Sequence, residues 1–267
     1  MAYPRITSTS NSRIKEMVRL REKNAERRRQ ALVLVEGIRE IAFALRRNLR
    51  KEFLFVCYEI VGFEANTIID AFRDHEIIEV NMEVFSRIAY REGSDGLLAV
   101  FHEPEMSLQQ LIPGQPAFVL ILDQIEKPGN LGAMLRSADA AGVDAVIVCD
   151  PVTDFYNPNV IRASLGTVFT LPLAAAEYVE VARWLEKWKI DPYAAVLSPD
   201  ALHYTLPDYT KDIALVMGTE SEGLGTFWIT ASTGKILIPM RGMADSLNVS
   251  AAAAVLMYEV VRQRMLK

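Results

Sequence analysis

The sequence predicts an α/β protein built from two units, and three observations support this prediction. Short apolar segments alternate with segments of helical periodicity along the whole chain. A stretch rich in chain breakers, including Pro104, Pro113 and Pro116, interrupts the alternation. The length of 267 residues and the apolar content of 51% suit one large or two modest domains. We therefore expect domains at residues 1–105 and 117–267, joined by a linker at 106–116.

The first unit is expected to be a small α/β sandwich, because its strands and helices are short and alternate. Its helices are expected at residues 11–29, 37–47, 66–73 and 82–89, and its strands at 31–35, 53–58, 77–80 and 97–101.

The second unit is expected to contain a five-stranded, mainly parallel sheet with helices on both faces, since its strands are continuous apolar runs. The expected strands lie near 118–123, 145–148, 193–197, 213–217 and 235–239, and the helices near 131–141, 177–188, 225–231 and 248–265.

Charge is distributed unevenly along the chain. The net charge is −5, yet residues 1–50 hold 13 Lys and Arg against 5 acids, a local charge of +8. Eight of these cations fall within residues 11–30, where Ile14, Met17 and Leu20 form an apolar stripe. A solvated helix surface would show the same pattern. One-sided positive charge in an acidic protein is also the footprint expected for contact with RNA phosphates, and we favour that interpretation.

Several function classes are disfavoured. No apolar stretch reaches 18 residues, and the N-terminus lacks a signal-peptide core, so neither a membrane span nor secretion is expected. Cys57 and Cys149 lie in hydrophobic contexts typical of reduced thiols in a cytoplasmic protein. The three histidines are scattered, and no metal site is expected. There is no G-x-G-x-x-G or Walker-type loop to hold a nucleotide phosphate.

Three segments of the second unit place glycines or polar residues directly after an expected strand, where α/β proteins bind ligands. They read Asn130-x-Gly132-x-x-x-Arg136, Gly218-x-Glu220-x-x-Gly223-Leu224, and Ile238-Pro239-Met240 followed by Ser246-Leu247-Asn248-Val249-Ser250.

These segments resemble the three ordered motifs of the SpoU/TrmH family, which comprises RNA ribose 2′-O-methyltransferases of the SPOUT superfamily. The likeness spans about residues 117 to 267. In the first unit, Val35-Glu36-Gly37 resembles the family's small RNA-binding domain of the ribosomal-protein L30e type. The resemblance implies a deep trefoil knot in the second unit, where strand order alone would suggest a Rossmann-like sheet. It also implies a homodimer formed through the C-terminal domain.

The resemblance further implies S-adenosylmethionine as cofactor, contacted by Gly218, Ile238 and Leu247. The residues that it places around the acceptor are Asn130, Arg136, Glu220, Ser246 and Asn248. Arg136 suits a role in holding the target phosphate and stabilising the developing alkoxide, because a guanidinium does not readily accept a proton. The proton acceptor stays open among a phosphate oxygen, Glu220 and water.

Some of these residues have structural alternatives. Helix capping is a rival explanation for Asn130 and Ser246, and Glu222 is interpreted as a solvated loop acid. Among the cations, Arg162 lies in a stretch that resembles the family's Arg-x-Ser-x-Gly and is a candidate RNA ligand. Further candidates in the first unit are Arg13, Lys15 and Arg39.

The sequence thus predicts methylation of a ribose 2′-hydroxyl in structured RNA, with 23S ribosomal RNA as the favoured target. A transfer RNA 2′-O-methyltransferase and a catalytically silent RNA-binding protein of the same fold are the alternatives.

Overall fold

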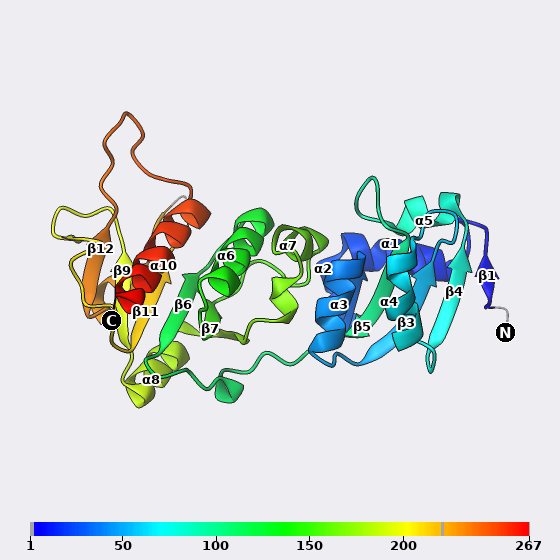
Figure 1. The fold of residues 1–267 in the computed structure, drawn as a ribbon. Helices are drawn as coiled ribbons and strands as arrows, with labels where there is room; N and C mark the ends of the chain where they lie inside the picture. Colours follow the sequence, from blue (N-terminus) through cyan, green and yellow to red (C-terminus); the bar gives the residue numbers. More distant parts are fainter. Residues whose placement is uncertain (1–2, 220–221, 267) are drawn as a thin grey trace. The chain divides into compact units, whose positions relative to one another are not determined.

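The computed structural model describes residues 3–219 and 222–266, drawn in colour in Figure 1. The chain forms two compact units. Unit 1 combines the residues up to 105 with residues 156–170, and unit 2 combines 106–155 with the residues from 171 onward. Within the described part, no helix has the length and apolar character needed to span a membrane.

Unit 1 is built on a five-stranded mixed sheet with the order β1-β4-β3-β5-β2. The pairs β1–β4 and β3–β4 are parallel, whereas β5 runs antiparallel to both β3 and β2. The strands are β1 (Arg5–Ile6), β2 (Leu32–Glu36), β3 (Lys51–Val56), β4 (Glu76–Val80) and β5 (Leu97–His102). The helices are α1 (Ser12–Glu22), α2 (Asn24–Gln30), α3 (Ile38–Arg46), α4 (Asn66–Ala71) and α5 (Met82–Ile88), with a 3₁₀ turn at Phe63–Ala65.

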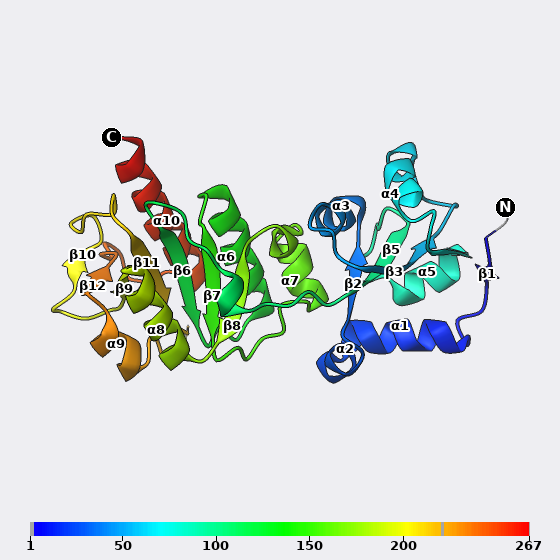
Figure 2. The same ribbon diagram turned by 90° about the horizontal axis from the view of Figure 1, so that it is seen from below.

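The sheet of unit 1 is covered on both faces. In Figure 2, α1, α2 and α5 lie on one side of it, and α3 and α4 lie on the other. The apolar stripe predicted for α1 is confirmed, since Ile14, Met17 and Leu20 are buried against Phe55 and Phe85.

The predicted single helix at 11–29 is wrong. Lys23 has an extended backbone and separates α1 from α2. The side chain of Arg27, only 3% exposed, donates to the carbonyl oxygens of Leu20 (2.5 Å) and Arg21 (3.0 Å). These carbonyls belong to the last turn of α1, which has no further helical donors. One of the predicted surface cations therefore closes the corner between two helices.

Residues 156–170 lie between two strands of unit 2 in sequence but pack with unit 1. They form α7 (Pro158–Ala163) and a 3₁₀ turn at Thr167–Phe169, which contact β2 and α3 respectively. Gly166 has φ +83°, and a Cβ there would lie 3.0 Å from the Cα of Glu40. No local pattern in the sequence indicates this packing.

Unit 2 contains a parallel sheet of seven strands with the order β10-β12-β9-β11-β6-β7-β8. The central strands β6 (Phe118–Asp123), β7 (Ala145–Cys149) and β11 (Ile213–Met217) are fully buried, as their continuous apolar runs predict. The other strands are β8 (Leu173–Ala176), β9 (Asp191–Ala195), β10 (Leu202–His203) and β12 (Gly234–Leu237).

The predicted count of five strands in this unit is wrong because β8 and β10 were not recognised. Both occupy an edge of the sheet, β8 consists mainly of alanines, and β10 is only two residues long. Such segments lack the apolar run on which the prediction relied.

Helices cover both faces of the seven-stranded sheet. They are α6 (Pro128–Ala140), α8 (Tyr178–Trp188), α9 (Thr226–Ala231) and α10 (Val249–Met265), with a 3₁₀ turn at Leu108–Gln110. Helices α6 and α10 pack together on one face, and α8 and α9 cover the other (Figure 2). The predicted α/β class is confirmed, whereas the trefoil knot stays a prediction.

The end of α10 is fixed by Arg264. Its guanidinium donates to the carbonyl oxygens of Tyr209, Pro116, Ala117 and Lys211 at 2.7–3.0 Å. Four carbonyls from two separate segments are thus satisfied by one side chain, and α10 is held against the start of β6 and of β11.

Candidate active site

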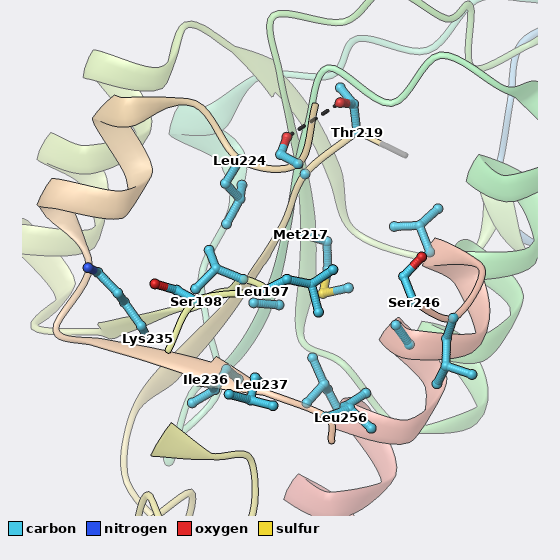
Figure 3. A pocket seen from close by; sticks show the side chains of 18 of the residues that line it. Leu197, Ser198, Met217, Thr219, Leu224, Lys235, Ile236, Leu237, Ser246 and Leu256 are labelled. Atoms are coloured by element: carbon cyan, nitrogen blue, oxygen red, sulfur yellow. Dashed lines mark hydrogen bonds between the residues drawn. The ribbon is translucent and has the colours of Figure 1, made fainter. Parts of the chain in front are cut away.

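The motif segments meet at the carboxyl end of the sheet in unit 2, around a cavity of about 660 Å³. The residues that line it come from the ends of β9 and β11 and the loops after them, from β12 and the loop after it, from α9 and from the first half of α10. Among the predicted cofactor residues, Gly218, Ile238 and Leu247 all line the cavity. Of the predicted acceptor residues, Ser246 and Asn248 line it as well. Figure 3 shows Ser246 on one side and Ser198 with Lys235 on the other, with Met217 between them.

The loop after β11 folds back on itself and requires glycine at its start. A Cβ on Gly218 would overlap the carbonyl group of Gly223 and the amide nitrogen of Leu224. The turn is closed by two backbone hydrogen bonds between Thr219 and Gly223, at 3.0 and 3.2 Å. Gly223 has φ +72°, which favours glycine. The backbone demands predicted for both glycines are confirmed, whereas Glu220 lies outside the described residues.

The far end of this loop is attached to β6 by Asp123. This carboxyl group is 7% exposed and accepts a hydrogen bond from the backbone N–H of Gly225. Burial raises the pKa of Asp123, the nearby Asp150 raises it further, and the bond from Gly225 opposes the shift. Asp123 therefore holds the end of β6 to the loop after β11, beside the cavity.

Asn248 connects the start of α10 to the start of α6. Its side-chain oxygen accepts from the backbone N–H of Ser250 (3.0 Å) and from the hydroxyl of Ser250 (2.6 Å), which makes Asn248 the N-cap of α10. Its amide nitrogen donates to the side-chain oxygen of Asn130 at 3.3 Å. Two residues from separate motifs are thus in direct contact.

Neither Asn130 nor Ser246 caps a helix, so the structure excludes helix capping as the explanation for these two residues. Helix α6 begins at Pro128, so Asn130 lies inside its first turn, and the N-cap, Lys127, makes no side-chain cap. Proline is well tolerated at this first position, so the helix begins three residues earlier than the expected 131. Ser246 precedes the N-cap of α10 by two residues and does not cap the helix either.

Arg136 lies on α6, about two turns from the helix start, and its side chain is exposed. It does not line the cavity among the described residues. This position leaves the guanidinium available to a macromolecular ligand approaching from outside unit 2.

The prediction missed one wall of the cavity, which follows β9 and comprises residues 195–198. At its rim, Lys235 donates to Asp200 (2.7 Å), and the Ser198 hydroxyl also bonds to Asp200. The lysine hydrogen bond lowers the pKa of Asp200 to about 2. The end of β9 lies at the same sheet edge as the motifs, and that topology could have revealed this wall. Glu222, interpreted as a solvated acid, is exposed and lines the cavity.

The predicted RNA ligands fall in unit 1 and differ in their availability. Arg13 makes a two-bond ion pair with Glu76 (2.6 and 2.8 Å) and stacks on Phe53. Lys15 and Arg39 are exposed on α1 and α3. Arg162 is also exposed, but α7 belongs to unit 1, whereas the sequence prediction assigned it to the second unit.

The cavity suits a cofactor that carries a nucleoside and a cation. Met217, Leu224, Ile236 and Leu256 provide an apolar middle, and polar groups lie at both ends. The loop after β11 contains Gly218 and Gly223, so its backbone can approach a ligand closely. Its acidic Glu222 would repel a pyrophosphate but not a sulfonium. These features fit S-adenosylmethionine.

Comparison with known proteins agrees with this geometry. Residues 117–258 match the SpoU rRNA Methylase family, and residues 11–99 match the MRM3-like substrate binding domain. The chain is 29% identical, over 96% of its length and 98% of the relative's, to the 23S rRNA (guanosine(2553)-2′-O)-methyltransferase RlmP of Bacillus subtilis (strain 168).

Two solved structures extend this likeness to the whole chain. An RNA 2′-O ribose methyltransferase superposes with a TM-score of 0.86 at 40% identity, covering 98% of this chain and 99% of the other. An AdoMet-bound rRNA methyltransferase from Sinorhizobium meliloti superposes with a TM-score of 0.89 at 27% identity, covering 97% and 98%. The chain therefore belongs to the SpoU rRNA Methylase family.

Proposed function

We propose that this protein transfers the methyl group of S-adenosylmethionine to a ribose 2′-hydroxyl of 23S ribosomal RNA. The observation that carries the proposal is the meeting of the three motifs at one place. Two of them line the 660 Å³ cavity, and the third touches its rim through the hydrogen bond between Asn130 and Asn248.

The cofactor would be held by Gly218, Ile238 and Leu247, largely through backbone groups that the tight loop after β11 exposes. When bound, it supplies an already activated methyl group as a sulfonium. The protein must then align the acceptor oxygen and manage its proton.

Asn130, Arg136, Glu220, Ser246 and Asn248 are proposed to act on the acceptor. Arg136 would hold the phosphate next to the target ribose with two parallel hydrogen bonds and stabilise the developing alkoxide. Asn130 and Asn248 are fixed by their mutual bond and by the cap of α10, so they can orient the ribose without reorganisation. Ser246, on the cavity wall, offers a further hydroxyl.

Ribosomal RNA is favoured as the substrate because relatives that match along nearly the whole chain include enzymes named for 23S rRNA. We assign RNA binding to the N-terminal domain (residues 1–105, with 106–116 as linker) and chemistry to residues 117–267. Arg13, Lys15, Arg39 and Arg162 are the proposed RNA ligands. An rRNA substrate and two free, buried cysteines favour the cytoplasm.

We further propose a homodimer formed through α10. This helix buries Leu256 and Val260 within unit 2, yet Val255, Tyr258 and Met265 are exposed along its other side. An apolar helix face of this kind is typical of an interface. Tyr258→Arg should convert a dimer into a monomer in light scattering, whereas the exposed Tyr178→Arg on α8 should not.

The decisive experiment compares ribose methylation across 23S rRNA in a deletion strain and its parent. One 2′-O-methyl group should disappear in the deletion strain and return when the gene is restored. Restoration by the purified protein with S-adenosylmethionine on unmodified 23S rRNA would assign the activity directly. An unchanged methylation map, with no transfer in vitro, would overturn the proposal.

A further inference from the structure

The cations of α1 and α2 fall into two groups once their contacts are known. Four of the eight within residues 11–30 are used inside unit 1. Arg13 pairs with Glu76, and Arg27 closes the corner between the helices. Arg21 donates to the carbonyl oxygens of Arg87 (3.1 Å) and Ala89 (2.6 Å) at the end of α5, and Arg29 pairs with Glu26.

The other four cations, Lys15, Arg19, Lys23 and Arg28, are exposed. None of them has an ion pair or side-chain hydrogen bond within residues 3–219 and 222–266. The acids of these two helices are largely engaged elsewhere, because Glu22 pairs with Arg21 and Glu26 with Arg29. Glu16 lies close enough to Arg29 to raise its pKa.

Three of these free cations follow one another along α1 and its C-terminal cap. Lys15 and Arg19 lie four residues apart on α1, about 6 Å along the helix axis, and Lys23 is the C-cap, whose backbone N–H donates to the carbonyl oxygen of Arg19. Ile14, Met17 and Leu20 face the opposite direction, into the core. The result is a cationic row along α1 and its C-cap, and α1 is anchored to the sheet beneath it. We refer to Lys15, Arg19 and Lys23 as the α1 row.

We propose that the α1 row is a phosphate-binding track for structured RNA, and that it contributes more of the electrostatic affinity of unit 1 than the partnered arginines beside it in sequence. The inference rests on the proposed function for the identity of the ligand. Regular spacing on a rigid helix fits a polyanion with evenly spaced charges, and unpaired cations can release phosphate counterions without first breaking an ion pair. Arg13, Arg21 and Arg29 would each have to give up a protein partner.

The test compares two variants that remove the same charge from opposite faces of one domain. Lys15→Gln, Arg19→Gln and Lys23→Gln are combined in the full chain. The matched control combines Arg46→Gln, Arg47→Gln and Arg73→Gln, three exposed cations at the end of α3 and next to α4, across the sheet. All six side chains are on the surface, so unfolding temperatures should stay close to the parent's.

Binding to a 23S rRNA transcript is measured by fluorescence anisotropy over a series of salt concentrations. The α1 row variant should bind about tenfold or more weakly, and the slope of log K against log salt should become shallower by about 2 to 3. The control should change affinity less than threefold and keep the parent's slope. Equal losses in both variants would show only a net-charge effect, and losses confined to the control would place the RNA on the α3 face. Either result, or no loss in either variant, overturns the proposal.

These measurements separate the α1 row from the proposed enzymatic function. Binding is read without methyl transfer, so a parent protein that binds the transcript but never methylates it would reject the function and leave the row untouched. A parent that methylates, with a row variant that binds as tightly as the parent, would reject only the row.

Discussion

The two units of this protein use their polar residues in opposite ways. In unit 2, the motif residues that line the cavity include two glycines, an amide and a hydroxyl, namely Gly218, Gly223, Asn248 and Ser246. In unit 1, the prominent residues are arginines, and four of the six on α1 and α2 are bound to partners within the unit. A sequence motif of glycines and amides therefore indicates a ligand-binding site more directly than a run of positively charged residues does.

The physical reason lies in what each residue type can do. A glycine that must accommodate backbone at contact distance has few alternative explanations. An arginine has five donors and a long apolar stem, so a helix corner, an ion pair and an RNA phosphate can all use it. Only the positions of the partners distinguish these uses.

The largest effect that would sharpen this comparison is expected from Arg136, a cation of unit 2 without a structural partner among the described residues. Arg136→Ala should lower the rate of methyl transfer by about 10²–10³, the usual cost of losing one group that stabilises transition-state charge. Affinity for S-adenosylmethionine should stay within a few-fold, because Arg136 does not line the described cavity. Single-turnover transfer and calorimetry measure the two quantities.

Arg183→Ala on α8 is the matched control, since this arginine is equally exposed in the same unit but lies on the opposite face of the sheet. Near-normal turnover of Arg136→Ala would show that unit 2 does not depend on a cation for its chemistry.

The next effect concerns the backbone of the cavity. Gly218→Val should weaken S-adenosylmethionine binding by about 100-fold, because the new side chain must displace the backbone of Gly223 and Leu224. Gly242→Val, in the exposed loop after β12, has open space around its Cα and should bind the cofactor normally. Calorimetry on both variants tests this, and equal affinities would mean that the cofactor does not depend on the loop after β11.

The sequence allowed the α/β class, the principal strands and the family motifs to be predicted because these depend on local patterns. Continuous apolar runs identified β6, β7 and β11, and the helix expected at 131–141 placed Arg136 correctly on α6. The errors arose where a distant partner decides the outcome. Arg13 finds Glu76 across 63 residues, and residues 156–170 pack against α3, which lies more than 100 residues earlier. No local pattern reports such contacts.

A third prediction concerns this segment from the middle of the chain. Its side chains Val160, Ile161 and Phe169 are buried, and Gly166 lies against α3. Removal of residues 1–105 should expose them, at about 1.5–3 kcal/mol for each large apolar side chain. The fragment 106–267 should therefore aggregate, whereas the same fragment with 156–170 replaced by a Gly/Ser linker should stay soluble and bind S-adenosylmethionine. Size-exclusion chromatography decides, and a monodisperse unmodified fragment would contradict the dependence on unit 1.

The smallest effect is expected at Asp123, where unit 2 buries a carboxyl group. Its pKa is raised by burial, so the folded protein binds more protons than the unfolded chain at pH values above the ordinary range near 4. The free energy of unfolding should thus fall as pH rises through the folded-state pKa. Asp123→Asn keeps an acceptor for the N–H of Gly225 but has no charge to bury, and it should lack this loss. We expect it to exceed the parent's stability at pH 8 by on the order of 1 kcal/mol and to match the parent near pH 4.

Urea unfolding at the two pH values measures this difference, with the exposed Asp191→Asn as control. Asp191 accepts a hydrogen bond from Thr233 that asparagine can also accept, so its substitution should leave the pH dependence unchanged. If Asp123→Asn is instead destabilising at pH 8, the ionised carboxylate itself must hold the glycine loop. The loop after β11 would then rely on a charge, as the corner between α1 and α2 does with Arg27, and the contrast between the two units would not hold at the edge of the cavity.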